Sequence, residues 1–167
     1  MYVVPQFPLT DTPRQFINLA YAYLDAAEAL TNSIVDGTWP GSFYRGQVTL
    51  LLAFHATELF LKGCIRSVAP HQAGNIHSLT DLCLRLEEVF PSVTFEPIFG
   101  MEPAPADTQI MKAALKADKE KHQEFRYPLS SSGIPWSENR SFEPVAFLAS
   151  LRRARAEFDR VFAVVFP

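Results

Sequence analysis

The chain has 167 residues, carries a net charge of −3 and is 48% hydrophobic. This length is typical of one domain, and the hydrophobic content excludes a disordered chain. The slight acidity disfavours non-specific binding to nucleic acid, which depends on lysine and arginine neutralising phosphates. We therefore expect a single domain over residues 1–167 and find RNA binding only weakly supported.

Hydrophobic periodicity predicts only helices, beginning with one over residues 13–35. Asp11 or Thr12 is its expected N-cap, because a short polar side chain there can accept a hydrogen bond from the first turn. A second helix is predicted over residues 42–68, where the densest apolar stretch of the chain lies. Residues 78–90 form a third predicted helix.

The remainder of the chain alternates loops and helices. Prolines concentrate in residues 91–106, which predicts a loop, and a thinly apolar helix rich in lysine follows over residues 107–124. A second loop over residues 128–140 leads to a last helix, which Ser141 is expected to cap and which extends to Val165. The fold class predicted is therefore all-α, an up-and-down bundle of about five helices.

The two cysteines, Cys64 and Cys83, stand among apolar residues and not in a C-x-x-C pair. We therefore expect reduced thiols, with no metal and no cofactor. The sequence shows no signal peptide and no run of the roughly 18 apolar residues that a membrane span requires. These features predict a cytoplasmic protein that does not contact a membrane.

One narrow arc of the second predicted helix is polar. On a helical wheel, His55, Glu58, Lys62 and Arg66 lie within about 80° of each other, and the remaining positions are mostly apolar. The simpler interpretation is a stripe that faces solvent, with Glu58 and Lys62 as an i,i+4 pair. The alternative is a cleft or a dimer seam, where a buried Glu58 needs a partner.

Arg126 is the candidate partner for Glu58 in that alternative. It stands beside Tyr127, where the predicted helix over residues 107–124 has just ended. The planar guanidinium group of an arginine suits two-point binding to a carboxylate. A Glu58–Arg126 contact is therefore the feature to check.

Three short segments stand out: Glu-Leu-Phe-Leu-Lys at 58–62, His-Ser-Leu-Thr-Asp-Leu at 77–82 and Phe-Arg-Tyr-Pro at 125–128. Together they resemble the HEPN superfamily of small helical-bundle domains. The resemblance implies a HEPN-like bundle that forms a homodimer. It also implies a toxin–antitoxin or phage-defence setting, in which many members are metal-independent ribonucleases and the partner is a nucleotidyltransferase-like protein.

The catalytic signature of those ribonucleases is an arginine followed after four to six residues by a histidine. Arg126 has no histidine among the next seven residues, although it occupies the expected late position. Arg66 and His71 satisfy the count, but they stand at the end of the second predicted helix with Pro70 between them. The signature is therefore incomplete.

Two functions follow from this departure. The first is a non-catalytic, dimeric binding or scaffold module whose polar seam is formed by His55, Glu58, Lys62 and Tyr127. The second is a divergent endoribonuclease, in which Arg126 works with His55, His77 or His122 brought near by the fold. An unrelated helical bundle that holds a small ligand among aromatic side chains is a third reading.

The sequence contains 14 phenylalanines, most of which must be buried in a core or an interface. A monomer of this size should not expose a large contiguous apolar patch. We therefore expect the first or last helix to pack in a two-fold interface.

Overall fold

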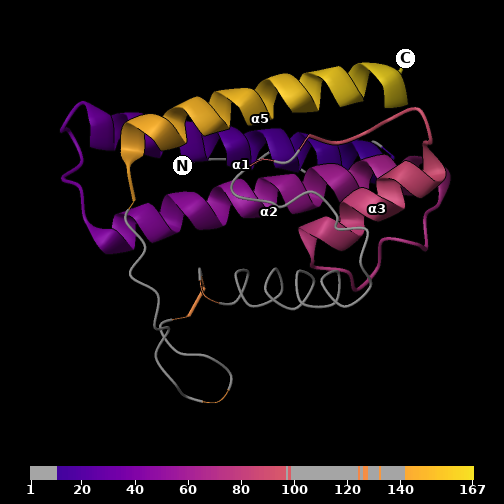
Figure 1. Ribbon diagram of the computed structural model, residues 1–167, viewed down its shortest axis with the longest axis horizontal. Coiled ribbons are helices and arrows are strands. Elements are labelled where there is room, and N and C mark those ends of the chain that lie inside the picture. The colour runs from indigo at the N-terminus through magenta and orange to yellow at the C-terminus, as the bar shows by residue number, and fades with distance from the viewer. Residues whose placement is uncertain (1–10, 97, 99–123, 125, 128–131, 133–141) are drawn as a thin grey trace, which may run out of the picture.

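The structure is a computed structural model that describes residues 11–96, 98, 124, 126, 127, 132 and 142–167 (Figure 1). Every regular element in these ranges is a helix, which confirms the all-α class. The helices are α1 (Thr12–Val35), α2 (Phe43–Val68), α3 (Leu79–Val89) and α5 (Pro144–Val165). The predicted helix over residues 107–124 lies outside the described residues except for its last position, so a count of five helices stays a prediction.

The starts of the helices follow local hydrogen-bonding signals. Asp11 caps α1 by accepting a hydrogen bond from the Arg14 amide at 3.0 Å, and Ser78 caps α3 in the same way. The last helix begins three residues later than Ser141, the predicted cap. Glu143 caps it instead, because Pro144 has no amide hydrogen to satisfy and favours the first helical position.

Three long helices form the body of the bundle. Figure 1 shows α1 and α2 running in opposite directions beside α5, with α3 next to the C-terminal half of α2. In the core, the Phe60 ring of α2 stacks on the Phe158 ring of α5 at a centroid distance of 4.1 Å. Tyr21 of α1 lies edge-on to both rings, so all three helices meet at this aromatic cluster.

α1 and α2 approach each other closely at Gly63. A Cβ atom at this position would lie 2.8 Å from Ile17 Cδ1, which is too short for two carbon atoms. The absence of a side chain at Gly63 therefore allows the two helices to pack closely.

α2 is the central helix. It is long and apolar enough by composition to cross a membrane, but 67% of its 18-residue apolar window is buried inside the protein. That burial is typical of a core helix with neighbours on several sides.

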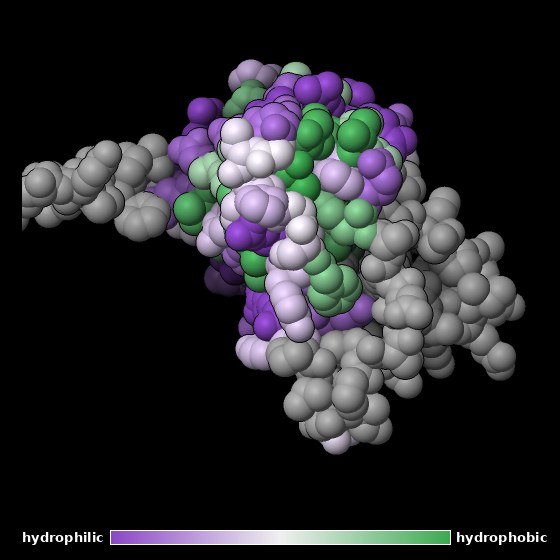
Figure 2. All heavy atoms as spheres, turned by 90° about the vertical axis from the view of Figure 1, so that its left-hand side faces the viewer, coloured by the Kyte–Doolittle hydropathy of each residue, from purple (hydrophilic) through white to green (hydrophobic). Residues whose placement is uncertain are grey.

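Some apolar side chains are exposed at the surface. Figure 2 shows hydrophobic groups among hydrophilic ones at the end of the bundle where α1 connects to α2. Val35, Phe43 and Val145, at the ends of three helices, are exposed.

Candidate functional site

The centre of the polar arc on α2 is a buried carboxylate. Only 3% of Glu58 and 6% of Lys62 is exposed, and Lys62 Nζ donates a hydrogen bond to Glu58 Oε1 at 2.9 Å. The two side chains meet because residues four apart lie on the same side of a helix. The simpler interpretation, a stripe that faces solvent, is therefore wrong for these two residues.

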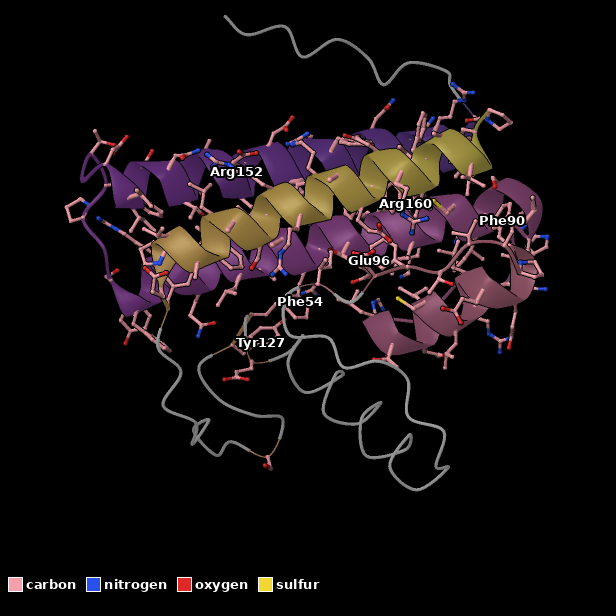
Figure 3. All side chains as sticks on the ribbon, turned by 45° about the horizontal axis from the view of Figure 1, so that its top comes forward. Phe54, Phe90, Glu96, Tyr127, Arg152 and Arg160 are labelled. Carbon is pink, nitrogen blue, oxygen red and sulfur yellow. The ribbon has the colours of Figure 1, made fainter. Side chains whose placement is uncertain are left out.

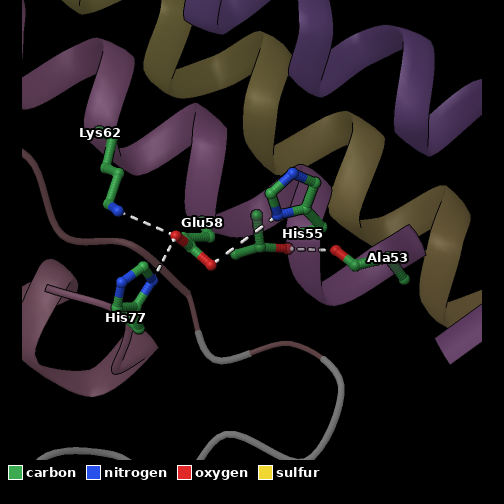
Figure 4. Close-up of polar contacts among 6 residues, drawn as sticks. Ala53, His55, Glu58, Lys62 and His77 are labelled. Atoms are coloured by element: carbon green, nitrogen blue, oxygen red, sulfur yellow. Dashed lines mark hydrogen bonds and ion pairs between the residues drawn. The ribbon is translucent and has the colours of Figure 1, made fainter. Parts of the chain in front are cut away.

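Two histidines flank this carboxylate (Figure 4). Nδ1 of His77, from the segment that leads into α3, lies 3.0 Å from Glu58 Oε1, and the His77 side chain is 53% exposed. Nδ1 of His55 lies 3.8 Å from Glu58 Oε2, and its ring packs edge-on against Tyr23 of α1. The structure thus brings together His55, Glu58 and Lys62, as the polar arc predicted, and adds His77 from a distant part of the sequence.

The arrangement has a structural and a chemical consequence. A carboxylate in an apolar interior is costly unless opposite charge and hydrogen bonds compensate it, and Lys62 supplies the charge. His77 joins α2 to the start of α3 through the same carboxylate. A carboxylate that holds Nδ1 of an imidazole is also the arrangement that fixes the orientation of a general base.

Among the described residues, Arg126 is not the partner of Glu58 that the sequence predicted. Arg126 is exposed, and within that part of the chain the structure records no ion pair between it and Glu58. Tyr127 is exposed as well, and Figure 3 places it on the side of α2 away from α1. The described partners of Glu58 come from α2 and from the segment before α3.

Arg66 and His71 are placed differently from a catalytic pair. The guanidinium carbon of Arg66 lies 5.0 Å from the centroid of the Phe16 ring, so Arg66 packs against α1. His71 is exposed in the turn that follows α2. Within the described residues no hydrogen bond or ring contact joins the two, and His122 lies outside these residues.

Sequence reasoning missed a second buried carboxylate, Glu157 of α5. It accepts a hydrogen bond from the Glu96 amide at 2.7 Å and two more from the Arg160 guanidinium group (labelled in Figure 3). This ion pair raises the pKa of Arg160. Glu157 thereby attaches the segment after α3 to α5. The only sequence signal was a Glu–Arg pair three residues apart beside an apolar stripe.

A row of polar contacts joins α1 to α5. The Tyr21 hydroxyl donates to Asp159 at 2.7 Å, and Arg155 pairs with Asp25 and, at 3.6 Å, with Glu28. Burial, and then the hydrogen bond to Asp159, raises the pKa of Tyr21 above its ordinary value. The contacts fix the last helix against the first.

The two cysteines are thiols, as predicted. Cys64 is fully buried in the core, and this burial raises the pKa of its thiol, whereas Cys83 is half-buried. Among the residues that the structure describes, no cluster of histidine, cysteine, aspartate and glutamate could hold a metal ion. Because it is buried, Cys64 lacks the exposed surroundings of a reactive thiolate.

Comparison with models of protein families, with curated proteins and with solved structures finds no match to this chain.

Proposed function

We propose that the chain is a HEPN-like, non-catalytic module that acts as a dimeric binding or scaffold domain. The four described helices would belong to the five-helix, up-and-down HEPN-like bundle that the sequence predicts. The setting we propose is a cytoplasmic toxin–antitoxin or defence system, with a nucleotidyltransferase-like protein as partner.

The observation that supports this proposal most is the burial of the Glu58–Lys62 pair. Both residues belong to the segment that resembles the superfamily, and the Glu58 carboxylate of this pair also contacts His77, which links α2 to the start of α3. The charge of Lys62 is directed at Glu58, so it does not lie on the surface where it could bind a phosphate. The polar residues of this segment therefore suit a structural role.

One observation favours a metal-independent endoribonuclease as the second candidate. His77 combines a half-exposed ring with a 3.0 Å contact between its Nδ1 and a buried carboxylate. An imidazole in this position can move protons near neutral pH, and Arg126 could bind the scissile phosphate. This function requires Arg126 and His77 to act on the same substrate, within one protomer or across a dimer.

The two functions are separated by an RNA cleavage assay. The purified protein is incubated with labelled RNA in the presence of a chelator, and the products are resolved on a denaturing gel. The scaffold proposal predicts that the RNA stays intact.

Three variants decide the outcome if cleavage is seen. Loss of cleavage in both Arg126→Ala and His77→Ala, with helical circular dichroism unchanged, would overturn the scaffold proposal and support the ribonuclease. His71→Ala is the matched control, because His71 is an exposed histidine outside the Glu58 cluster. Cleavage that survives all three substitutions would indicate a contaminating nuclease.

A further inference from the structure

His77 is the more exposed of the two histidines that flank Glu58. Its side chain is 53% exposed, whereas that of His55 is 27% exposed. Nδ1 of His77 lies 3.0 Å from Glu58 Oε1, and Figure 4 shows the second ring nitrogen, Nε2, on the side of the ring away from the carboxylate. The ring is therefore held at one nitrogen by a buried group, while much of its surface remains in contact with water.

Glu58 determines which nitrogen of His77 carries the proton. An ionised carboxylate only accepts hydrogen bonds, and the Lys62 ammonium group, 2.9 Å from the same oxygen, stabilises its negative charge. The contact at Nδ1 therefore requires a proton on Nδ1. A neutral imidazole in this tautomer has its lone pair on Nε2, where it can attack an electrophile.

The surroundings of His77 suit an electrophile that brings negative charge. Lys62 neutralises Glu58, so the carboxylate does not repel an approaching anion. His77 also directly precedes Ser78, the N-cap of α3, and the positive end of a helix dipole favours an anion nearby. Asp81 in the first turn opposes this effect, so the neutralised carboxylate is the larger contribution. A phosphoryl group is an electrophile of this charge.

We propose that Nε2 of His77 is a phosphoryl acceptor. The donor is a phosphoramidate, the class of N–P compound to which the phosphohistidine of another protein belongs. The Nε2 lone pair forms a bond to phosphorus while the N–P bond of the donor breaks, and the leaving nitrogen takes up a proton from water. The Nδ1 proton stays in its hydrogen bond to Glu58, and this carboxylate compensates the positive charge that the ring acquires. The modification goes beyond the proposed function and does not depend on it.

The other described histidines lack this combination of exposure and carboxylate contact. Nδ1 of His55 lies 3.8 Å from Glu58 Oε2, which is beyond hydrogen-bond distance, and its ring packs edge-on against Tyr23. His71 is exposed, but the ion pairs that the structure records among the described residues join only His55 and His77 to a carboxylate. We therefore expect His77 to react faster than either of the other two.

The test uses potassium phosphoramidate as the donor and the full chain as the acceptor. The protein is incubated with this compound at neutral pH, intact mass spectrometry counts the phosphoryl groups on each chain, and peptide mapping identifies the modified residue. Phosphorus NMR of the unfolded product distinguishes a phosphoryl group on Nε2 from one on Nδ1. We expect one group per chain, on Nε2 of His77, added at least about 10-fold faster than at His71.

Three variants test the parts of this proposal. His77→Ala should lose the modification, and His71→Ala is the matched control that should keep it. In Glu58→Gln/Lys62→Met an amide oxygen replaces the carboxylate, and both buried charges are removed together. Its rate should fall by about 10-fold, which corresponds to about 1.4 kcal/mol in the activation barrier, because the positive charge on the ring is no longer compensated.

Several results would overturn the inference. They are a reaction at His77 no faster than at His71, a main product on Nδ1, and a main product on His55 or His122. An unchanged rate in Glu58→Gln/Lys62→Met, with circular dichroism unchanged, would overturn it too, since exposure alone would then explain the reaction.

A comparison in urea needs no variant. Unfolding removes the contact with Glu58, so His77 and His71 should then react at equal rates. Selectivity that survives in urea would come from the neighbouring sequence and not from the fold, which would also overturn the inference. No RNA is present in any of these assays, so their results are independent of the ribonuclease candidate.

Discussion

Replacement of Lys62 by methionine tests whether the Glu58–Lys62 pair is a buried ion pair that the fold needs. Methionine keeps the length and the apolar stem of lysine, so little packing is lost and the change is mainly the removal of one charge. Glu58 then remains 3% exposed without its nearest cation. Breaking a buried pair in this way typically costs about 3–5 kcal/mol.

We expect the free energy of unfolding to fall by about 3 kcal/mol in Lys62→Met, at the lower end of that range, because His77 stays beside the carboxylate. The double variant Glu58→Gln/Lys62→Met should be more stable than Lys62→Met alone. It removes the carboxylate charge that the single variant leaves buried, and contacting residues commonly show coupling of about 0.5–3 kcal/mol.

Urea unfolding at pH 7, followed by far-ultraviolet circular dichroism, measures these differences. Arg85→Met is the control, because it breaks an ion pair with Glu88 in which both side chains are largely exposed. This control should change stability by less than about 1 kcal/mol. If Lys62→Met lowered the free energy of unfolding by no more than Arg85→Met does, the buried Glu58–Lys62 pair would not be needed for the stability of the fold.

Three further predictions concern the core. Gly63→Ala should lower the free energy of unfolding, measured with urea, by about 1–3 kcal/mol, because the added methyl group collides with Ile17. A gain in stability would contradict the close packing of α1 and α2. The free energy of unfolding should decline above about pH 10, because the raised pKa of Tyr21 in the folded protein makes this side chain ionise more readily in the unfolded chain. Tyr21→Phe should weaken this decline. Ellman's reagent should modify Cys83 much faster than Cys64 in the native protein, and equal rates would show that Cys64 is not held in the core.

The starts of three helices could be predicted because each depends on a few neighbouring residues. Asp11, Ser42 and Ser78 cap α1, α2 and α3 by accepting hydrogen bonds from amides three residues ahead. Asp11 was one of the two caps expected for the first helix, and the predicted helices over residues 42–68 and 78–90 begin at the other two capping residues. The last helix was less predictable, because Ser141 and Glu143 both offer a side-chain acceptor and Pro144 decides between them.

The site was predictable only in part. Helical geometry places His55, Glu58 and Lys62 on one arc, but it does not determine what covers that arc. The contact with His77 spans 19 positions in the sequence and depends on how α3 packs against α2. The burial of Glu58 therefore follows from tertiary packing, which no local pattern encodes.

The polar contacts between α1 and α5 have a consequence for the order in which the chain folds. Tyr21 and Asp159 are 138 positions apart, and Asp25 and Arg155 are 130 apart. During synthesis α1 and α2 can pair early as a local helical hairpin, but the charged edge of α1 stays exposed until the last helix has left the ribosome. Truncation within α5 would therefore leave an exposed half-bundle, which should be a substrate for chaperones and proteases.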